Sequence, residues 1–278
     1  MHSFRHGDFY SFRADANALG GFLELPDRKV VPTVAPVSLP PVGGFATARA
    51  DRFNLEDIVS CAAAYTRVSG VENRDGSIGI LTTAIVEDLN ILEVVRAERV
   101  VAQVSISLPK GGSAIDISLA GSRFEGLRVA GSDAHPIPNR ALTFPASPQT
   151  GHHLPLTWQD VQKAGQSQAK ALVDSFKACR DGDANQWAQD RHGWMDSKPP
   201  AEGGDLLCSL LDGFGARDSF ESYGHIVVIP GFGRFHFGEL FLSRASVQLV
   251  MIRAELGCPV QGKITVAAGG GGGGDGKS

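Results

Sequence analysis

The chain has 278 residues and a formal net charge of −4, and hydrophobic residues make up 42% of it. This is enough apolar material for one large core or two smaller ones. The charge lacks the basic excess that a non-specific nucleic-acid or anionic-membrane binder needs, and no apolar run is long enough for a transmembrane helix. Glycine (34) and proline (15) favour a β-rich fold with many turns over a helical bundle.

The first residues contain no apolar stretch of the length that a secretory signal needs. We therefore expect a cytoplasmic location, with a surface or extracellular location by non-classical export as the alternative. Neither membrane insertion nor nucleic-acid binding is expected.

Residues 1–50 predict an extended, proline-rich amino-terminal arm. Four prolines between residues 32 and 41 exclude a helix or a central strand, and leave edge segments or an arm that wraps around a neighbour. We expect the arm and the strand edges to mediate self-association into a homo-oligomer. The candidate contact residues are Val30, Val34, Val37, Leu39, Val42 and Phe45.

Residues 51–131 predict a β-rich block, because runs rich in Val, Ile and Ala alternate with turn signals such as Asn73–Gly76. A short pattern recurs in this block at residues 86–91, 97–102 and 124–129. In each copy two outward residues stand together between inward ones. Such a phase shift predicts a bend, either the corner of a solenoid or a bulged strand in a sandwich.

Residues 132–203 predict a proline-rich loop followed by a helical insertion. Thr157 and Asp160 have the spacing of a helix-starting capping box, and apolar residues then follow at helical intervals. A second short helix is expected at residues 183–195. The insertion contains all three tryptophans of the chain, Trp158, Trp187 and Trp194, and is expected to dock on the β core as a lid.

Residues 204–268 predict a carboxy-terminal β block that completes the core, and residues 269–278 predict a flexible glycine-rich tail. In the block, the alternation of Phe235, His236 and Phe237 predicts that the histidine faces away from the phenylalanines and outward. A phase change at Gly238-Glu239 predicts a bulge, and Glu239 is the carboxylate most expected to be partly buried. The whole chain is thus expected to form an all-β core, solenoid-like or sandwich-like, with a small α-helical insertion.

The cysteines, histidines and glycines that could form a metal or nucleotide site do not stand in a complete motif for one. The four cysteines have no zinc-module spacing and are interpreted as buried apolar residues. The tail matches a phosphate-loop pattern, but no helix can follow it within this chain. His152 and His153 stand together without a third ligand at helical spacing. We therefore expect no catalytic residue, cofactor or metal, and a role outside catalysis.

The predicted bends carry carboxylates with arginines close by, a pattern that allows two interpretations. A row of carboxylates and arginines on one face could bind or cleave polysaccharide, because glycosidic chemistry uses paired carboxylates. Alternating charges on an outer β face also keep a sheet soluble and protect its edges. The residues are Glu87, Asp88, Glu98, Glu125, Arg96, Arg99, Arg123 and Arg128.

Two segments, residues 81–131 and 233–268, resemble bacterial proteins of the choice-of-anchor P family. The resemblance is carried by TTAIVEDLNILEVVRAERVVAQVSIS, AGSRFEGLRVAG and GRFHFGELFLSRASVQLVMIRAELGCPVQGKITVAA. It implies an all-β module of surface or exported proteins with no established catalytic activity. The chain departs from that family by its tryptophan-bearing insertion and by the lack of a visible signal or anchor.

Two functions from different classes follow. The first is a non-enzymatic structural or interaction protein that associates with itself into an oligomer or filament. The alternative is a carbohydrate-binding or carbohydrate-active protein that uses the charged outer face and stacks sugars on Trp158, Trp187 or Trp194.

Overall fold

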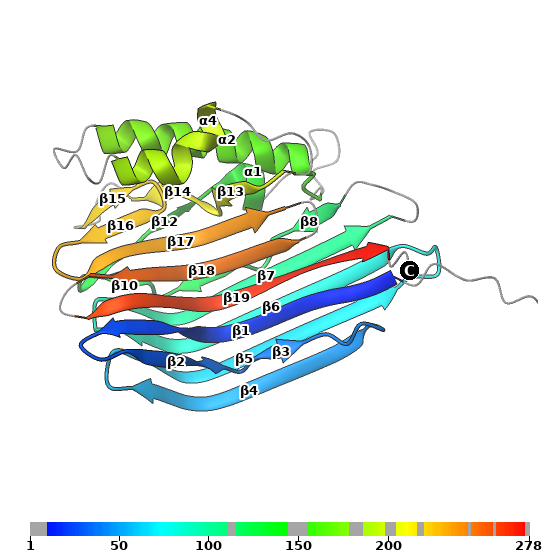
Figure 1. Ribbon diagram of the computed structural model, residues 1–278, viewed down its shortest axis with the longest axis horizontal. Helices are drawn as coiled ribbons and strands as arrows, with labels where there is room; N and C mark the ends of the chain where they lie inside the picture. Colours follow the sequence, from blue (N-terminus) through cyan, green and yellow to red (C-terminus); the bar gives the residue numbers. More distant parts are fainter. Residues whose placement is uncertain are drawn as a thin grey trace, which may run out of the picture.

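The computed structural model describes residues 10–109, 115–143, 155–177, 186–197, 204–215, 220–243, 246–257 and 260–275. Over these residues the chain is built from two large antiparallel sheets with a small helical layer at one end (Figure 1). The predicted all-β core with a helical insertion is therefore confirmed. Because the two sheets pack on each other through β1, β5, β6, β7, β18 and β19, the arrangement is a sandwich.

Sheet A has the order β15–β16–β17–β18–β19–β1–β2, with β13 beside β17 and β3 beside β1. Its two longest strands, β1 and β19, come from opposite ends of the chain and pair with each other. Its strands are β1 (Tyr10–Leu25), β2 (Lys29–Val34), β3 (Val37–Ser38), β13 (Leu206–Ser209), β15 (Glu221–Tyr223), β16 (Ile226–Ile229), β17 (Gly233–Leu242), β18 (Val247–Leu256) and β19 (Gln261–Asp275).

Sheet B has the order β11–β10–β7–β6–β5–β4, with β8 and β9 also paired to β7. Three long hairpin-connected strands, β5, β6 and β7, form its centre, as the alternation in residues 51–131 predicts. Its strands are β4 (Gly44–Leu55), β5 (Val59–Glu72), β6 (Ile78–Ile91), β7 (Val95–Leu108), β8 (Asp116–Ser118), β9 (Arg123–Glu125), β10 (Arg128–Val129) and β11 (Ser132–Asp133). A third, two-stranded sheet pairs β12 (Pro136–Pro138) with β14 (Leu211–Phe214).

The glycine-rich segment is the largest departure from the sequence prediction. Residues 269–275 were expected to be a flexible tail, but they form the second half of β19 and pair with β1 on one side and β18 on the other. The glycines bring the two sheets close together, because a Cβ added at Gly269 would lie 3.2 Å from Thr82 Oγ1 and one at Gly271 would lie 3.1 Å from Ile80 Cγ2, both on sheet B. The prediction of a flexible tail was wrong for these residues.

The predicted amino-terminal arm is also part of the sandwich. Residues 10–25 form β1 inside sheet A, so the prediction of an arm was wrong there. The prolines behave as expected, because Pro32 lies in β2, the last strand of sheet A. Of the residues proposed for self-association, Val34, Val37 and Leu39 are buried in the chain's own core, whereas Val30, Val42 and Phe45 are exposed.

The recurring sequence pattern marks one bend that crosses sheet B. Glu87 on β6 lies opposite Arg99 on β7, which lies opposite Glu125 on β9, so the three copies stand side by side. Asp88 and Gly126 in this row have φ values of +50° and +58°, which turn the strands without shifting their register. The pattern is therefore a row of bends in a sandwich sheet.

Sheet A has an equivalent row of bends. Gly238 on β17 and Ala267 on β19 have φ values of +66° and +48°, and both lie opposite Met251 of the strand between them. The register of β17 on β18 is the same before and after Gly238. The predicted bulge at Gly238-Glu239 was therefore wrong, although the phase change that motivated it is present.

The helical layer covers one end of sheet A (Figure 1). Its main helix, α2 (Trp158–Lys177), starts at the predicted capping box: Thr157 Oγ1 donates to Asp160 Oδ2 at 2.7 Å, and Asp160 N lies 3.3 Å from Thr157 Oγ1. It packs on β13 through Gly165, where a Cβ would lie 3.1 Å from the Leu207 carbonyl oxygen. Further helical elements in the described residues include α1 (Arg140–Thr143), the π-helix η1 (Gln189–Gly193), which follows helical residues 186–188, and α4 (Trp194–Ser197).

Within the described residues, none of the helices combines the length and the apolar character needed to cross a membrane.

Candidate functional site

The floor of the candidate site is the outer face of β17 and β18 in sheet A. Along β17, Phe235 and Phe237 face the core, and Phe237 contacts Phe124 of sheet B with 5.8 Å between ring centroids. His236 therefore faces the other side of the sheet. The bend at Gly238 brings Glu239 onto the same face as His236, and Arg253 of β18 lies opposite His236.

The helical segment that contains η1 covers this outer face. The Trp187 ring lies 5.6 Å from His236, and Arg191 reaches down to Glu239. His236 is 0% exposed as a result. The alternation predicted the correct face for His236, but the prediction that it is outward was wrong because the insertion covers that face.

Glu239 is the centre of an ion-pair network. Arg253 donates to both of its carboxylate oxygens, from Nε to Oε2 at 2.5 Å and from Nη2 to Oε1 at 2.9 Å. Arg191 Nη2 donates to Oε1 at 3.0 Å. Arg253 also pairs with Glu255, so the face has two carboxylates and two guanidinium groups in contact. The expectation that Glu239 is at least partly buried is confirmed, since its side chain is 7% exposed.

The network keeps both carboxylates ionised. Burial by itself would raise the pKa of Glu239, but His236 and the Arg253 guanidinium outweigh burial and hold that pKa well below its usual range. Burial also opposes ionisation of Glu255, yet its contacts with His236 and Arg253 lower its pKa to about 2. Neither group is suited to be a proton donor near neutral pH.

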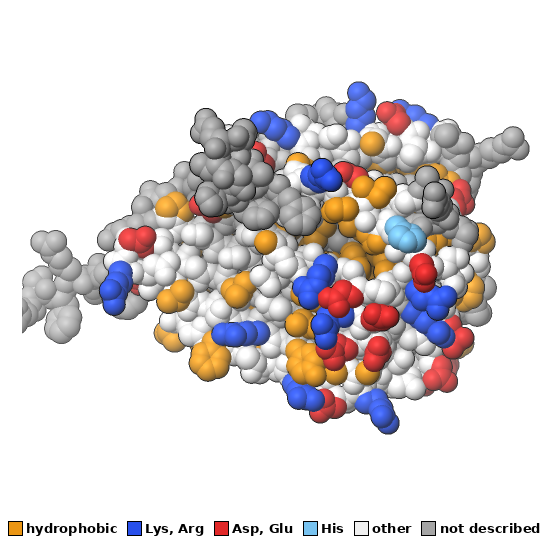
Figure 2. All heavy atoms as spheres, turned by 180° about the vertical axis from the view of Figure 1, so that it is seen from behind, with side chains coloured by type: hydrophobic (Ala, Val, Ile, Leu, Met, Phe, Trp, Pro, Cys, Tyr) orange, Lys and Arg blue, Asp and Glu red, His pale blue; other side chains and the backbone are white. Residues whose placement is uncertain are grey.

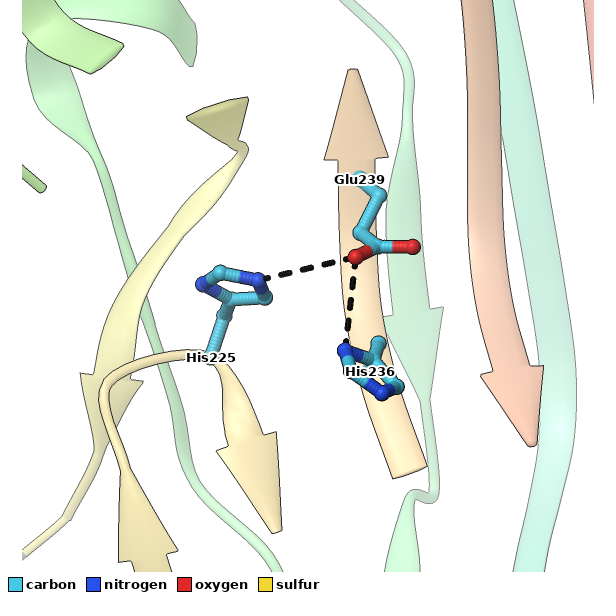
Figure 3. A group of neighbouring side chains, drawn as sticks. All are labelled: His225, His236 and Glu239. Carbon is cyan, nitrogen blue, oxygen red and sulfur yellow. Dashed lines mark ion pairs between the residues drawn. The ribbon is translucent and has the colours of Figure 1, made fainter. Parts of the chain in front are cut away.

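Three buried histidines surround the network. His225 precedes β16, His236 lies on β17 and His192 lies on η1, and their rings are 5.9 Å (His192–His225) and 6.4 Å (His225–His236) apart. Burial is the main reason why the pKa of His192 falls to about 2 and that of His225 to about 3. His225 and His236 both point toward Glu239 (Figure 3).

The fold brings together three side chains of kinds that bind metal ions: His225, His236 and Glu239. One donor atom from each of His225, His236 and Glu239 lies within 4.8 Å of the other two. No motif in the sequence joins all three, because His225 reaches the other two only across the β16–β17 pair. The spacing of His236 and Glu239, three residues apart on one strand, was the only local signal.

A cavity of about 810 Å³ opens between the helical segment and the sheet. Its floor comes from β13, β17 and β18, and its wall comes from the segment around η1. Aromatic, charged and amide side chains are mixed in the lining. The lining residues are Gln186, Trp187, Asp190, Arg191, Trp194, Leu207, Glu239, Phe241, Gln248, Val250 and Arg253. We call this cavity the groove.

The groove contains two of the three tryptophans that the sequence singled out. Trp187 and Trp194 line it, whereas Trp158 lies elsewhere and directs its indole N–H to the Gly204 carbonyl oxygen at 3.4 Å. The sequence did not point to Arg191, Gln248 or Arg253. These polar residues lie on separate elements, and no sequence pattern shows that they meet.

The charged row at the bends is not part of the groove. On sheet B, Arg99 pairs with both Glu87 and Glu125, and its Nη2 lies 2.8 Å from Glu87 Oε1. Figure 2, seen from behind the view of Figure 1, shows acidic and basic side chains gathered together on one part of the surface. These pairs fit the interpretation as a solvated outer face.

The described cysteines are buried and free, as expected. Burial raises the pKa of Cys208 to about 12 and also raises that of Cys61, so neither thiol is activated. Cys179, Cys258, His152 and His153 lie outside the described residues.

Comparison with known protein families identifies a match. A family model described as "Domain of unknown function (DUF8256)" matches residues 9–243, a range that includes the helical insertion, His225, His236 and Glu239. No curated protein and no solved structure matches the chain. The resemblance to the choice-of-anchor P family stays a prediction.

Proposed function

The chain belongs to this family of unknown function, and we propose that it is a binding protein whose groove takes a carbohydrate. The observation that carries the proposal is the mixture of side chains in the groove. Trp187, Trp194 and Phe241 line one cavity together with arginine, carboxylate and amide groups. A sugar ring has apolar C–H faces and a rim of hydroxyl groups, so it needs both kinds of contact.

The aromatic side chains are held in place before a ligand arrives. The Trp194 indole N–H donates to the Arg191 carbonyl oxygen at 2.8 Å, and the Arg234 guanidinium lies 4.4 Å from the centre of the Trp187 ring. Phe176 meets Trp187 edge-on at 5.6 Å. Rings that are already fixed lose little conformational entropy when a ligand stacks on them.

The polar groups of the groove favour binding over cleavage. Glycoside hydrolysis needs one carboxylic acid with a raised pKa, so that it can protonate the leaving oxygen. Contacts with His236 and Arg253 lower the pKa of Glu239, which lines the groove, and also that of Glu255, which lies outside the lining but pairs with Arg253. Ionised carboxylates accept hydrogen bonds from sugar hydroxyls, and the guanidinium and amide groups donate them.

A glycan array followed by calorimetric titration tests the proposal. We expect saturable binding of at least one glycan, and we expect Trp194→Ala to weaken it at least about tenfold, which corresponds to about 1.4 kcal/mol. Trp158→Ala is the matched control, since Trp158 is a tryptophan of the same insertion that does not line the groove. Absence of glycan binding, or equal losses in the two variants, would refute the proposal.

A second candidate function is self-association through the edge of sheet B. The supporting observation is that β4, twelve residues long, is paired only with β5 among the strands of the described residues. Val42, in the turn just before β4, and Phe45, near the start of the strand, are 90% and 72% exposed. An open edge strand can pair with the same strand of a second copy about a two-fold axis.

Light scattering on the double variant Val42→Glu/Phe45→Glu tests this candidate. We expect the wild-type chain to be larger than a monomer and the variant to be monomeric, because a charge at the edge opposes pairing. Ile137→Glu is the control, since Ile137 is 47% exposed but lies on β12 of the third sheet. A monomeric wild-type chain would exclude the candidate.

A further inference from the structure

The cluster of His225, His236 and Glu239 has the spacing of a metal site (Figure 3). His236 Nδ1 lies 3.3 Å from Glu239 Oε1, and His225 Nε2 lies 4.0 Å from the same oxygen. Ligand atoms at about 2.0–2.1 Å from a tetrahedral zinc ion are separated by distances of roughly 3.4 Å. The three atoms can therefore converge on one ion with small side-chain movements.

The imidazole nitrogens of the cluster make no hydrogen bond. His225 Nε2 and both nitrogens of His236 are buried and unsatisfied within the described part of the chain, although each faces a carboxylate, with His236 Nε2 at 3.6 Å from Glu255 Oε2. The side chains of His225 and His236 are 5% and 0% exposed. A buried polar atom without a partner costs free energy, and most such atoms in native proteins are satisfied. A ligand at the cluster would remove this cost.

We propose that His225, His236 and Glu239 bind a divalent transition-metal ion, with Zn²⁺ as the reference ion. Two imidazoles and one carboxylate, with a position left for a further ligand, are a donor set that such ions accept. Mg²⁺ is not expected to bind, because it prefers an all-oxygen environment.

Two guanidinium groups already occupy the carboxylate oxygen that the ion would bind. Glu239 Oε1 accepts hydrogen bonds from both Arg191 and Arg253, so a cation has to displace one of them. Arg191 is the group that leaves, because its side chain is 30% exposed and makes a single contact with Glu239. Arg253 is 14% exposed and stays bound to Oε2 and to Glu255.

This exchange predicts an unusual effect of one substitution. Arg191→Ala removes a positive charge that competes with the metal for Oε1. We expect the variant to bind Zn²⁺ more tightly, by roughly tenfold or more, because the ion then no longer has to displace a guanidinium group from Oε1. A purely structural role of Arg191 would give weaker binding or no change.

The test is calorimetric titration of the full chain with Zn²⁺ after treatment with a chelator. We expect one Zn²⁺ per chain, no heat with Mg²⁺, and binding at least about tenfold weaker in His236→Ala. The double variant His152→Ala/His153→Ala is the control, because these histidines are adjacent in the sequence and could capture zinc without the cluster.

Visible absorption of the Co²⁺-loaded wild-type chain is the second readout, and it is independent of whether His236→Ala folds. We expect d–d bands typical of mixed nitrogen and oxygen ligation, which Zn²⁺ then abolishes by displacement. Three results would overturn the proposal: no stoichiometric uptake by the wild-type chain, zinc uptake lost only in the His152/His153 variant, or unchanged affinity in Arg191→Ala. None of these results depends on whether the groove binds a carbohydrate.

Discussion

Arg253 holds Glu239 by two hydrogen bonds from a position that is not directly opposite it. Glu239 on β17 pairs with Val250 on β18, whereas Arg253 pairs with His236. The contact forms because the bend at Gly238 places Glu239 and His236 on the same outer face, where the arginine side chain lies across both. The pair forms part of the floor of the groove and fixes the carboxylate that faces the histidines.

Glu239→Gln is expected to destabilise the fold strongly. The substitution removes the charge that compensates Arg253, and the loss of one partner from a buried ion pair costs about 3 kcal/mol or more. The midpoint of urea unfolding measures the change. Glu93→Gln is the matched control, since Glu93 pairs with Arg96 at 2.9 Å but its side chain is 76% exposed. Equal shifts of the midpoint in both variants would mean that burial of the pair adds nothing.

The stability of the fold is expected to fall as the pH drops below about 6.5, before the carboxyl groups titrate. Burial lowers the pKa of His225 from 6.5 to about 3. Between these pH values the unfolded chain binds a proton at this histidine and the folded chain does not, so protonation stabilises the unfolded state. The stabilising effect of neutral His225 is therefore complete above pH 6.5 and is lost as the pH falls toward 3. The lowered pKa of Glu255 adds a second loss between pH 4.5 and about 2.

Urea midpoints measured from neutral pH to about 4.5 in the presence of a chelator test this dependence. The charged and titratable groups near His225 are Glu239, His236, Arg191 and Arg253. His225→Gln removes the proton uptake at this position and leaves those groups in place. We expect a flatter curve for His225→Gln and an unchanged curve for His135→Gln, a substitution at an exposed histidine. The same slope in all three proteins would contradict the assignment.

Gly270→Ala is expected to destabilise the fold by roughly 1–3 kcal/mol, since it forces the backbone apart. A Cβ at this position would lie 2.2 Å from the Val247 carbonyl oxygen in the neighbouring strand. At Gly20 the nearest atom to an added Cβ is 3.7 Å away, so Gly20→Ala is the control and should be close to neutral. Thermal unfolding of the two variants is the measurement. If residues 269–275 were a flexible tail, both substitutions would be neutral.

Gly238→Ala tests the bend beneath Glu239. A residue with a Cβ is strained at a φ of +66°, and the added atom would lie 3.1 Å from Leu210 Cβ. We expect a loss of about 1–2 kcal/mol from the backbone conformation, and more from the contact. Gly231→Ala has a similar φ of +79° and no atom within 4 Å, so the difference between the two urea midpoints isolates the crowding. A larger loss in Gly231→Ala would contradict this explanation.

The strands that the sequence predicted correctly are those in which local alternation is strong. In β5, β6, β7, β17 and β18 the core-facing side chains, mostly apolar, alternate on both sides of a phase change, and each strand is long enough for the period to be visible. The α2 start was predicted for a similar local reason, because Thr157 and Asp160 cap each other within four residues. The glycine-rich half of β19 has no side chains that alternate, so only pairing with β1 and β18 makes it a strand.

The candidate site was predictable only in part. The phase change at Gly238 pointed to Glu239, and the helical insertion with its tryptophans was expected to form a lid. Alternation also assigned His236 to the face opposite Phe235, but alternation along one strand cannot indicate what covers that face. His225 and Arg191 come from other elements, and no local pattern links them to Glu239.

By itself, the sequence determined the fold class and the faces of most strands, because both follow from interactions between residues that are near each other in the chain. Tertiary structure decided which face is covered and which charges meet: the segment around η1 closes over sheet A, and β1 joins β19 from the other end of the chain. The physical reason is that ion pairs, buried imidazoles and close sheet packing depend on distances between elements, and those distances are fixed only when the sheets have assembled.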